Sequence, residues 1–326
     1  MKAFVCHALS EDLSGVGIAQ RPLPEPGAGE IRLKVEAASV NFPDILLCQG
    51  KYQLKLDPPF VPGMDMAGIV DAVGDDVTQF AVGDAVAGGA RFGGFAEYAL
   101  ASAGGLQKKP DGMSFAEAAA FPAAYLTAYV ALVRRANLQA GETLLVHGAS
   151  GGVGLAAVDV GKLIGATVIA TSASDAKLAE VVAYGADYAL NVTQGFKDRV
   201  KSLTAGRGAD VIFDPVGGDV FDESVRCIAF DGRLCVIGFM SGRIATLPTN
   251  MALIKGFSLV GVRAGEYGRQ FPEKGVENTQ AIWDWARAGQ VRPRVHAQYK
   301  LEDTRAAFEA LISRKVIGKV IITPNG

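Results

Sequence analysis

In the first 110 residues, hydrophobic positions occur in short runs that are separated by glycine, proline and aspartate. The runs read IRLKVEAASV, AGIVDAVG, GDAVAGG and FAEYALA. Short apolar runs bounded by turn-forming residues are typical of β-strands rather than helices. We therefore expect this N-terminal part to be rich in β-structure.

A helix is predicted directly after this part. Ser114 and Glu117 stand three residues apart before an alanine-rich run, so the hydroxyl can cap the first turn while the carboxylate bonds back to the cap. Pro122 lacks the N–H that an uninterrupted helix would use. The stretch 115–136 is therefore expected to form two helices that meet at a kink, and we place a domain boundary there.

From Glu142 onward, strands and helices are predicted to alternate. The pattern reads strand TLLVHG, helix VGLAAVDVGKLIGA, strand TVIATS, helix DAKLAEVVAYG and strand ADYALN, with later strands DVIFDPV, RLCVIGF and SLVGVR. Alternation of this kind builds a parallel sheet covered by helices on both faces, an α/β fold. Because the alternation stops near Arg263, the tail is expected to return to the first domain. The expected domains are 1–122 with 268–326, and 123–267.

Composition and charge are those of an ordinary globular protein with room for two domains. The chain has 326 residues, of which 49% are hydrophobic, and its formal net charge of −2 comes from interleaved acidic and basic residues. Such a balance offers no binding surface for nucleic acid or an anionic membrane. There is no run of about 20 apolar residues for a membrane span, and acidic residues come too early for a signal peptide. We expect a cytoplasmic protein.

The four cysteines form no C-x-x-C pair and no disulfide framework. They are Cys6, Cys48, Cys227 and Cys235. We expect reduced and mostly buried thiols.

The segment HGASGGVG joins a predicted buried strand to a predicted helix. Ala149, Gly151 and Gly154 fit the spacing G-x-G-x-x-G, with alanine in the first place. Glycines at this spacing let the backbone approach a pyrophosphate, whose charge then rests on the N–H groups of the helix N-terminus. A single glycine motif can also be a plain tight turn. Here a strand precedes it and a helix and a second strand follow, which favours dinucleotide binding.

The end of that second strand indicates which dinucleotide is bound. NAD sites usually carry an acidic residue there for the ribose 2′-hydroxyl, whereas TVIATSASDAK offers Ser172, Ser174 and then Lys177. A lysine can donate a charge-assisted hydrogen bond to a 2′-phosphate, worth about 1.5–3 kcal/mol. NADP(H) is favoured. Alternatively, Lys177 is a solvated surface lysine, and the neighbouring Asp175 weakens its positive field.

These segments, in this order, resemble the medium-chain dehydrogenase/reductase superfamily, and in particular its zinc-independent quinone oxidoreductase (zeta-crystallin-like) branch. The resemblance rests on SVNFPD at 39–44, VPGMDMAG at 61–68, FPAAYLTAY at 121–129, VHGASGGVGLAA at 146–157 and DPVGG at 214–218. Together these motifs span most of the chain. The resemblance implies a GroES-like, β-rich catalytic domain and a Rossmann cofactor domain with a doubly wound parallel sheet.

The zinc ligands of that superfamily's alcohol dehydrogenases have no counterpart here. Those enzymes hold zinc with a cysteine in C-x-x-D, a histidine in G-H-E and a third ligand further along; the corresponding positions here are Asn41, Met64 and Ala123. None of these can replace a thiolate or an imidazole on zinc. We expect no metal, with Asp65 acting as a hydrogen-bonding residue. The three histidines fit no ligand spacing and are expected to be structural: His7, His147 and His296.

Further site residues follow from the resemblance, position by position. It implies that Asn41 and Thr127 contact the nicotinamide end, and that Tyr52 lines the substrate cleft as a proton donor or as an aromatic wall. The other implied cofactor contacts are Ser150, Gly151, Gly152 and Val153 at the pyrophosphate, Ser172 and Lys177 at the ribose phosphate, Gly238 and Phe239 near the carboxamide, and Arg314 at a phosphate. The chain departs from some relatives at Leu46, where a second tyrosine can occur, and at Val192, where an aromatic residue can flank the ribose.

Without a metal to polarise a carbonyl, the substrate must accept a hydride through its own conjugation. The expected function is hydride transfer from NADPH to a quinone or another conjugated carbonyl. One alternative is an enone or enoyl/acrylyl-CoA reductase, for which Arg91, Arg263 and Arg269 are candidate contacts of the CoA phosphates. Another alternative is a non-enzymatic NADPH-binding protein. A short-chain dehydrogenase is excluded because the chain has no Y-x-x-x-K motif.

The apolar strand SLVGVR is expected at the edge of the parallel sheet. An exposed apolar edge strand tends to pair with another chain. We therefore expect a homodimer built on this strand.

Overall fold

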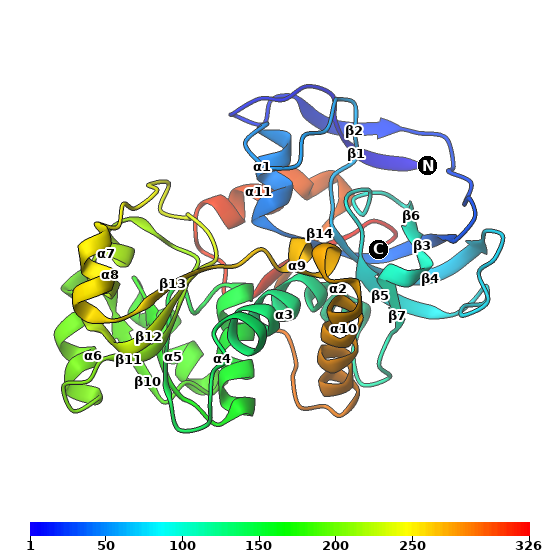
Figure 1. The fold of residues 1–326 in the computed structure, drawn as a ribbon. Helices are drawn as coiled ribbons and strands as arrows, with labels where there is room; N and C mark the ends of the chain where they lie inside the picture. The colour runs from blue at the N-terminus through cyan, green and yellow to red at the C-terminus, as the bar shows by residue number, and fades with distance from the viewer. The chain divides into compact units, whose positions relative to one another are not determined.

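Two units divide the chain in this computed structural model, which describes residues 1–326. Unit 1 comprises Met1–Ala123 and Arg292–Gly326, and unit 2 comprises Ala124–Val291. In Figure 1 the colour runs from blue to green through the first part of unit 1 into unit 2, which continues through yellow to orange as far as residue 291, and the remaining tail, which ends in red, belongs to unit 1 again. None of the helices combines the length and the apolar character that a membrane crossing requires.

Unit 1 is built on β-sheet, as the short apolar runs predicted. One sheet has the order β14-β15-β3-β4-β5-β7, with β6 also paired to β3, and a second sheet joins β1 and β2. The strands are β1 (Lys2–Cys6), β2 (Val16–Gln20), β3 (Glu30–Val40), β4 (Asp65–Val73), β5 (Ala85–Gly89), β6 (Tyr98–Ser102), β7 (Leu106–Lys108), β14 (Val295–Lys300) and β15 (Lys319–Thr323). The helices of unit 1 are α1 (Phe42–Cys48), α2 (Phe115–Ala120) and α11 (Thr304–Ile312).

The C-terminal tail completes this unit. Strand β15 pairs antiparallel with β3, so that Val320 lies opposite Val40. The ring of Phe308 on α11 lies 5.6 Å from that of Phe4 and 5.9 Å from that of Phe95, measured between centroids. All three rings are buried. The return of the tail to the first domain is therefore confirmed.

The helix start at Ser114 is also confirmed. The Ser114 hydroxyl accepts a hydrogen bond from the backbone N–H of Glu117 (3.2 Å), and the Glu117 carboxylate accepts one from the backbone N–H of Ser114 (2.9 Å). Helix α2 ends at Ala120, and α3 (Pro122–Tyr129) begins at the proline before a π-helical segment, η2 (Val130–Arg135). The chain thus forms two helices that meet next to Pro122, close to the division between the units.

Unit 2 holds a six-stranded parallel sheet in the order β10-β9-β8-β11-β12-β13. Its strands are β8 (Thr143–Val146), β9 (Thr167–Ser172), β10 (Tyr188–Asn191), β11 (Ala209–Asp214), β12 (Ile228–Val236) and β13 (Ser258–Gly261). Its remaining helices are α4 (Gly152–Ile164), α5 (Asp175–Tyr184), α6 (Lys197–Leu203), α7 (Gly218–Cys227), α8 (Thr249–Lys255), α9 (Ala264–Gln270) and α10 (Pro272–Arg287). Right-handed crossovers place α4 and α5 on one face of the sheet and α6 and α7 on the other, as can be followed in Figure 1. This is the doubly wound arrangement expected from the alternating pattern.

The chain returns to unit 1 later than position 268, where the sequence analysis placed the return. Helices α9 and α10 belong to unit 2 because α10 is anchored to η2 and α3. Arg134 donates to Asn278 (2.7 Å) and to Glu277 (2.6 Å). The ring of Tyr129 lies 5.4 Å from that of Trp285. An amphipathic helix does not reveal from its own pattern which domain it packs on.

His147, which follows β8, is a structural residue of the unit 2 core. It is fully buried, with its Nδ1 atom 2.8 Å from the Thr171 hydroxyl and its Nε2 atom 2.7 Å from the Ser224 hydroxyl. The Ser224 hydroxyl donates its own proton to the Val220 carbonyl (2.7 Å), and the corresponding bond from the Thr171 hydroxyl to the Val146 carbonyl is longer (3.3 Å). The geometry therefore favours the tautomer in which Nε2 donates to Ser224. Burial lowers the pKa of His147 from 6.5 to about 4.

This lowered pKa predicts a loss of stability in acid. The folded chain favours neutral His147, so the stabilisation is present above pH 6.5 and is lost as the pH falls toward 4. The change in pKa corresponds to about 3 kcal/mol. In urea unfolding, the free energy of the wild type should fall between pH 7 and pH 4 by about 3 kcal/mol more than that of His147→Gln. An equal fall in both proteins would contradict the buried neutral imidazole.

Candidate functional site

The carboxyl ends of the parallel strands form the candidate site of unit 2. The chain starts in the middle of the sheet with β8, proceeds outward through β9 and β10, and then crosses back to β11. In open parallel sheets, ligands bind at the carboxyl ends of the strands where the winding direction reverses. The segments that follow β8 and β11 therefore flank the expected binding crevice.

The glycine-rich turn after β8 leads directly into α4. Gly148 has a positive φ of 56°, and Gly151 is the N-cap of the helix. A Cβ atom on Gly154 would lie 2.4 Å from the Gly148 carbonyl oxygen, so this close contact between helix and turn requires glycine. A Cβ on Gly151 would meet only that same oxygen, at 3.4 Å. The turn therefore keeps open backbone beside the N-terminus of a 13-residue helix, which fits a dinucleotide pyrophosphate.

The N–H groups at the start of α4 supply the donors for such an anion. In the first turn of a helix these groups have no intrahelical partner. They come from Gly152 and Val153, which were predicted to line the pyrophosphate. Ser150, also a predicted contact, is buried within the turn.

The turn after β11 lies against the glycine turn and against the loop after β12. The Asp214 carboxylate shapes it by accepting hydrogen bonds from the backbone N–H groups of Val216 (2.8 Å) and Gly217 (2.9 Å). A Cβ on Gly148 would lie 3.4 Å from the Val216 side chain, and one on Gly238 would lie 3.2 Å from the Pro215 carbonyl oxygen. The structure thus brings the glycine turn and the Gly238 segment to the two sides of this turn.

Phe239 follows Gly238 on the same loop. Its side chain is 46% exposed, which is unusual for a large aromatic residue. An aromatic side chain presented at the carboxyl edge of the sheet is available to a ligand there.

The tip of β9 carries no carboxylate, as the sequence indicated. Ser172 ends the strand, and Lys177 lies in the first turn of α5. Partial burial lowers the pKa of Lys177. The Asp175 carboxylate accepts a hydrogen bond from the Asn191 amide at the end of β10 (2.8 Å), so a neighbouring side chain holds it in place. The polar groups at this tip are compatible with a 2′-phosphate.

The site residues of unit 1 centre on Asn41, the N-cap of α1. Its backbone N–H donates to the Asp44 carboxylate (2.8 Å), and its side-chain nitrogen donates to the Asp65 carboxylate (2.9 Å) and to the Ser39 carbonyl (3.3 Å). The Lys319 ammonium donates to the Asn41 side-chain oxygen (2.5 Å). Asp65 therefore acts as a hydrogen-bonding residue, as expected.

The charged members of this cluster are fully enclosed. Asp44 is 0% exposed, Asp65 2% and Lys319 5%. Burial raises the pKa of Asp44 to about 7, raises that of Asp65 and lowers that of Lys319, because a low-polarity interior disfavours the charged form of each group. Buried charges persist only when they are paired and hydrogen-bonded. Removal of one member of the cluster should therefore destabilise the others.

A zinc ion does not fit this cluster. The positions that hold zinc ligands in the superfamily's alcohol dehydrogenases carry the thioether of Met64, the methyl group of Ala123 and the Asn41 amide, which is already engaged by the cation Lys319. In residues 1–326, no three His, Cys, Asp or Glu side chains come together in a way that could hold a metal ion.

The remaining predicted residues lie outside the two groups just described. Tyr52 follows α1 and packs half-buried on the apolar core of unit 1. Thr127 is half-buried on α3 in unit 2. Arg314 follows α11 and is exposed. The roles of these three residues stay predictions.

Lys319 is a polar residue of the site that the sequence analysis missed. A signal for it is present in the segment GKVIITP, where a lysine begins a run that is otherwise apolar. Lysine is almost never fully buried unless it is paired. A lysine at the start of an otherwise apolar run therefore calls for a buried partner.

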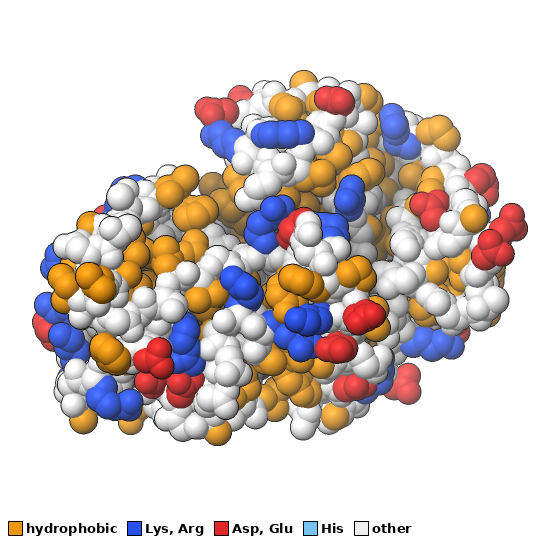
Figure 2. All heavy atoms as spheres, in the orientation of Figure 1, with side chains coloured by type: hydrophobic (Ala, Val, Ile, Leu, Met, Phe, Trp, Pro, Cys, Tyr) orange, Lys and Arg blue, Asp and Glu red, His pale blue; other side chains and the backbone are white.

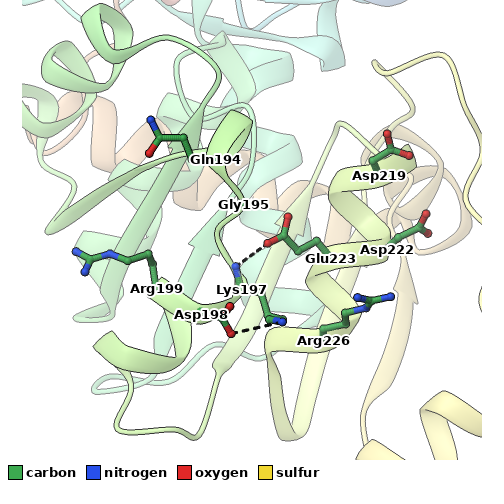
Figure 3. A pocket seen from close by; sticks show the side chains of 9 residues that line it. All are labelled: Gln194, Gly195, Lys197, Asp198, Arg199, Asp219, Asp222, Glu223 and Arg226. Atoms are coloured by element: carbon green, nitrogen blue, oxygen red, sulfur yellow. Dashed lines mark hydrogen bonds and ion pairs between the residues drawn. The ribbon is translucent and has the colours of Figure 1, made fainter.

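A surface pocket of about 490 Å³ lies between the segment 194–199 and helix α7 (Figure 3). Glu223 accepts hydrogen bonds there from the backbone N–H groups of Phe196 (2.6 Å) and Lys197 (2.8 Å), which anchors the start of α6. Charges of both signs line the pocket, and none of the predicted site residues does.

Two family models match the chain. The one described as "Alcohol dehydrogenase GroES-like domain" covers residues 27–111, and the one described as "Zinc-binding dehydrogenase" covers residues 152–280. Quinone oxidoreductase-like protein 2 of Mus musculus is 38% identical over 324 residues, which are 99% of this chain and 92% of that protein.

Solved structures give the same result. The quinone oxidoreductase of Escherichia coli complexed with NADPH has a TM-score of 0.91 at 26% identity and covers 99% of this chain and 100% of its own. The CurK enoyl reductase has a TM-score of 0.90 at 27% identity and covers 99% of both chains.

The chain belongs to the quinone oxidoreductase (zeta-crystallin-like) branch of the medium-chain dehydrogenase/reductase superfamily. The predicted fold class, a GroES-like domain joined to a Rossmann domain, is confirmed. The words "zinc-binding" in the family description do not match the residues that this chain carries at the zinc positions.

The two glycines of the turn should respond differently to alanine. Gly154→Ala places a methyl group against backbone atoms and should cost about 1–3 kcal/mol of stability. Gly151→Ala, at a φ of −78° and with its Cβ no closer than 3.4 Å to any neighbouring atom, should change stability by no more than about 0.5 kcal/mol. Urea unfolding of the two variants provides the measurement. Equal stability losses would show that the close contact at Gly154 does not organise the turn.

Proposed function

We propose that this protein is an NADPH-dependent oxidoreductase that transfers a hydride to a quinone or another conjugated carbonyl without a metal ion. One observation carries the proposal: the dinucleotide turn is intact, while the zinc-ligand positions carry Asn41, Met64 and Ala123, and Asn41 is hydrogen-bonded to Asp65 and Lys319. The E. coli relative complexed with NADPH supports the choice of cofactor, as does the absence of a carboxylate at the tip of β9.

The chemistry follows from this arrangement. Bound NADPH would supply the hydride from C4 of its nicotinamide ring. With no Lewis acid at the carbonyl, the acceptor must delocalise the incoming electron pair itself, which quinones and enones do. The residues of the chain bind and orient the partners. A proton must also reach the product, from the Tyr52 phenol or from water.

Reduction of an enone or enoyl thioester is the second candidate. The similarity to the CurK enoyl reductase favours it. A CoA thioester calls for a basic surface, however, and two of its candidate residues are engaged elsewhere. Arg263 and Arg269 lie 3.7 Å and 2.9 Å from the Glu266 carboxylate. These exposed pairs are weak, so the comparison of acceptors below decides between the two candidates.

Steady-state oxidation of NADPH by three acceptors tests the proposal. We expect turnover with 9,10-phenanthrenequinone to exceed that with 2-cyclohexenone and acrylyl-CoA. A clear preference for acrylyl-CoA would favour the thioester reductase. Tight NADPH binding without turnover of any acceptor would favour a non-enzymatic binding protein.

Lys177→Ala tests the preference for the phosphorylated cofactor. Loss of one charge-assisted hydrogen bond should raise the Kd for NADPH roughly ten- to a hundredfold and leave the Kd for NADH nearly unchanged. Fluorescence titration measures both constants. Lys274→Ala, at an exposed lysine of α10, is the matched control and should change neither. Equal effects of Lys177→Ala on the two cofactors would remove Lys177 from the phosphate site.

Tyr52→Phe separates the two roles considered for that residue. If the phenol donates the proton, kcat for 9,10-phenanthrenequinone should fall roughly 10²–10⁴-fold, while the KM for NADPH stays near its wild-type value. If the ring is only a wall of the cleft, kcat should stay unchanged, because phenylalanine keeps the ring. We expect the first outcome.

We further propose that the chain forms a homodimer through β13. This strand is at the edge of the unit 2 sheet, and large apolar side chains lie exposed around it: Phe230 (82%), Leu253 (84%), Ile254 (70%) and Leu259 (47%). Figure 2 shows hydrophobic side chains at the surface in the region of α8. An exposed apolar patch next to an unpaired strand edge favours association of two chains.

Light scattering after size-exclusion chromatography tests the dimer. The wild type should have twice the chain mass of 34.0 kDa, and Leu259→Asp should be monomeric because it buries a charge in the interface. Val82→Asp, at an exposed valine of unit 1, should leave the dimer intact. A monomeric wild type at micromolar concentration would contradict this interface.

A further inference from the structure

The orientation of the Asn41 side-chain amide is fixed by its partners. An amide offers an oxygen that accepts and a nitrogen that donates two hydrogen bonds. The Lys319 ammonium can only donate, so it requires the oxygen on its side (2.5 Å). The Ser39 carbonyl can only accept, so it requires the nitrogen on the opposite side (3.3 Å).

Both N–H bonds of this amide are already used inside the protein. One points to the Asp65 carboxylate (2.9 Å) and the other to the Ser39 carbonyl. The oxygen has two lone pairs, and Lys319 takes one of them. Since Asn41 is 8% exposed, a small part of the residue remains accessible. The Asp44 backbone N–H also faces the Asn41 side chain in the capping box of α1, but it forms no side-chain cap hydrogen bond and donates instead to the Asn41 backbone carbonyl (3.0 Å). The second lone pair of the side-chain oxygen is therefore the polar function left for a ligand.

We propose that Asn41 presents a hydrogen-bond acceptor, and not a donor, to the bound ligands, and that Asp65 and Lys319 are the positioning residues that enforce this polarity. The inference rests on the proposed function, in which Asn41 meets the reacting partners. The ligand group that it recognises is then an N–H or an O–H. The carboxamide of a nicotinamide and the hydroxyl group of a hydroquinone both carry such a donor.

When a conjugated acceptor is reduced, its carbonyl oxygen gains negative charge. A residue that stabilises this oxygen must donate a hydrogen bond. Asn41 has no N–H to spare for it. That stabilisation and the proton must come from elsewhere, and Tyr52 in unit 1 is the residue that carries a suitable phenol.

Exchanging the side chains of residues 41 and 65 tests directly whether position 41 must accept a hydrogen bond from the ligand. In the double variant Asn41→Asp/Asp65→Asn, the carboxylate at 41 accepts from Lys319 and from the new amide nitrogen at 65. The amide oxygen at 65 remains for the backbone N–H of Ala123, which donates to Asp65 in the wild type. The formal charge is unchanged, and the 3.3 Å contact with the Ser39 carbonyl is lost. Position 41 then holds an acceptor and no donor at all.

The experiment compares the wild type, both single variants and the double variant. For each protein, the Kd for NADPH and the kcat and KM for 9,10-phenanthrenequinone are measured. Thermal unfolding checks that each variant folds. Asn41→Asp alone sets two carboxylates against each other and should weaken NADPH binding at least about tenfold. The double variant should recover binding and turnover to within about threefold of wild type. A folded double variant that is as impaired as Asn41→Asp would overturn the proposal, because it would show that a donor is needed at position 41.

The Kd for NADPH and the kinetic constants for the quinone distinguish whether Asn41 binds the cofactor or the hydroquinone. If the carboxamide of the cofactor is the partner, the Kd for NADPH follows the pattern of loss and recovery. If the hydroquinone is the partner, that pattern appears in kcat or in the KM for the quinone. A wild type that binds NADPH but reduces no conjugated acceptor would refute the proposed function, while the Kd pattern would still decide the polarity of Asn41.

If the double variant does not fold, variants of Lys319 provide a second test. Lys319→Arg keeps a donor toward the Asn41 oxygen, so it should lower stability by about 1–3 kcal/mol through its added volume but retain the Kd for NADPH and kcat within about threefold in the folded variant. Lys319→Met removes the donor and should raise the Kd or lower kcat at least about tenfold. Wild-type values of all these constants in folded Lys319→Met would overturn the positioning role.

Discussion

The hydrogen bond from the Lys319 ammonium to the Asn41 amide is the interaction on which the rest of the site depends. It places a fixed, protein-borne cation beside the position where alcohol dehydrogenases of the superfamily hold a metal ion. Its cost is the desolvation of Lys319 and of the buried carboxylates Asp44 and Asp65. That cost is offset only if all members of the cluster are present and bonded. The cluster therefore excludes a ligand set for zinc and holds Asn41 in one orientation.

The two units contribute different parts of the chemistry. Unit 2 supplies the features of a dinucleotide-binding site: a parallel sheet, a glycine turn packed closely against α4, and a strand tip without a carboxylate. Unit 1 supplies the buried polar cluster, whose side chains come from three separate segments around residues 41, 65 and 319. In the proposed function, the acceptor must delocalise the incoming electron pair because this cluster offers no metal ion to polarise it.

Features that depend on neighbouring residues could be predicted from the sequence. The Ser114–Glu117 cap, the break at Pro122, the glycine turn and the parallel sheet expected from alternating strands and helices all agree with the structure. Features that depend on distant contacts could not. The partner of Lys319 lies 278 residues away along the chain, and no local pattern identifies it. Helix α10 was assigned to the wrong side of the domain boundary because its attachment to Arg134 and Tyr129 is a tertiary contact.

The most direct test of the account is NADPH oxidation by protein that has been dialysed against a strong chelator. The rate is measured with 9,10-phenanthrenequinone and with a plain aliphatic aldehyde, before and after addition of zinc. The account predicts that the quinone is reduced at the same rate with or without zinc, and that the aldehyde is not reduced in either case. Aldehyde reduction that appears only after zinc is added, together with loss of quinone turnover in the chelated protein, would contradict it.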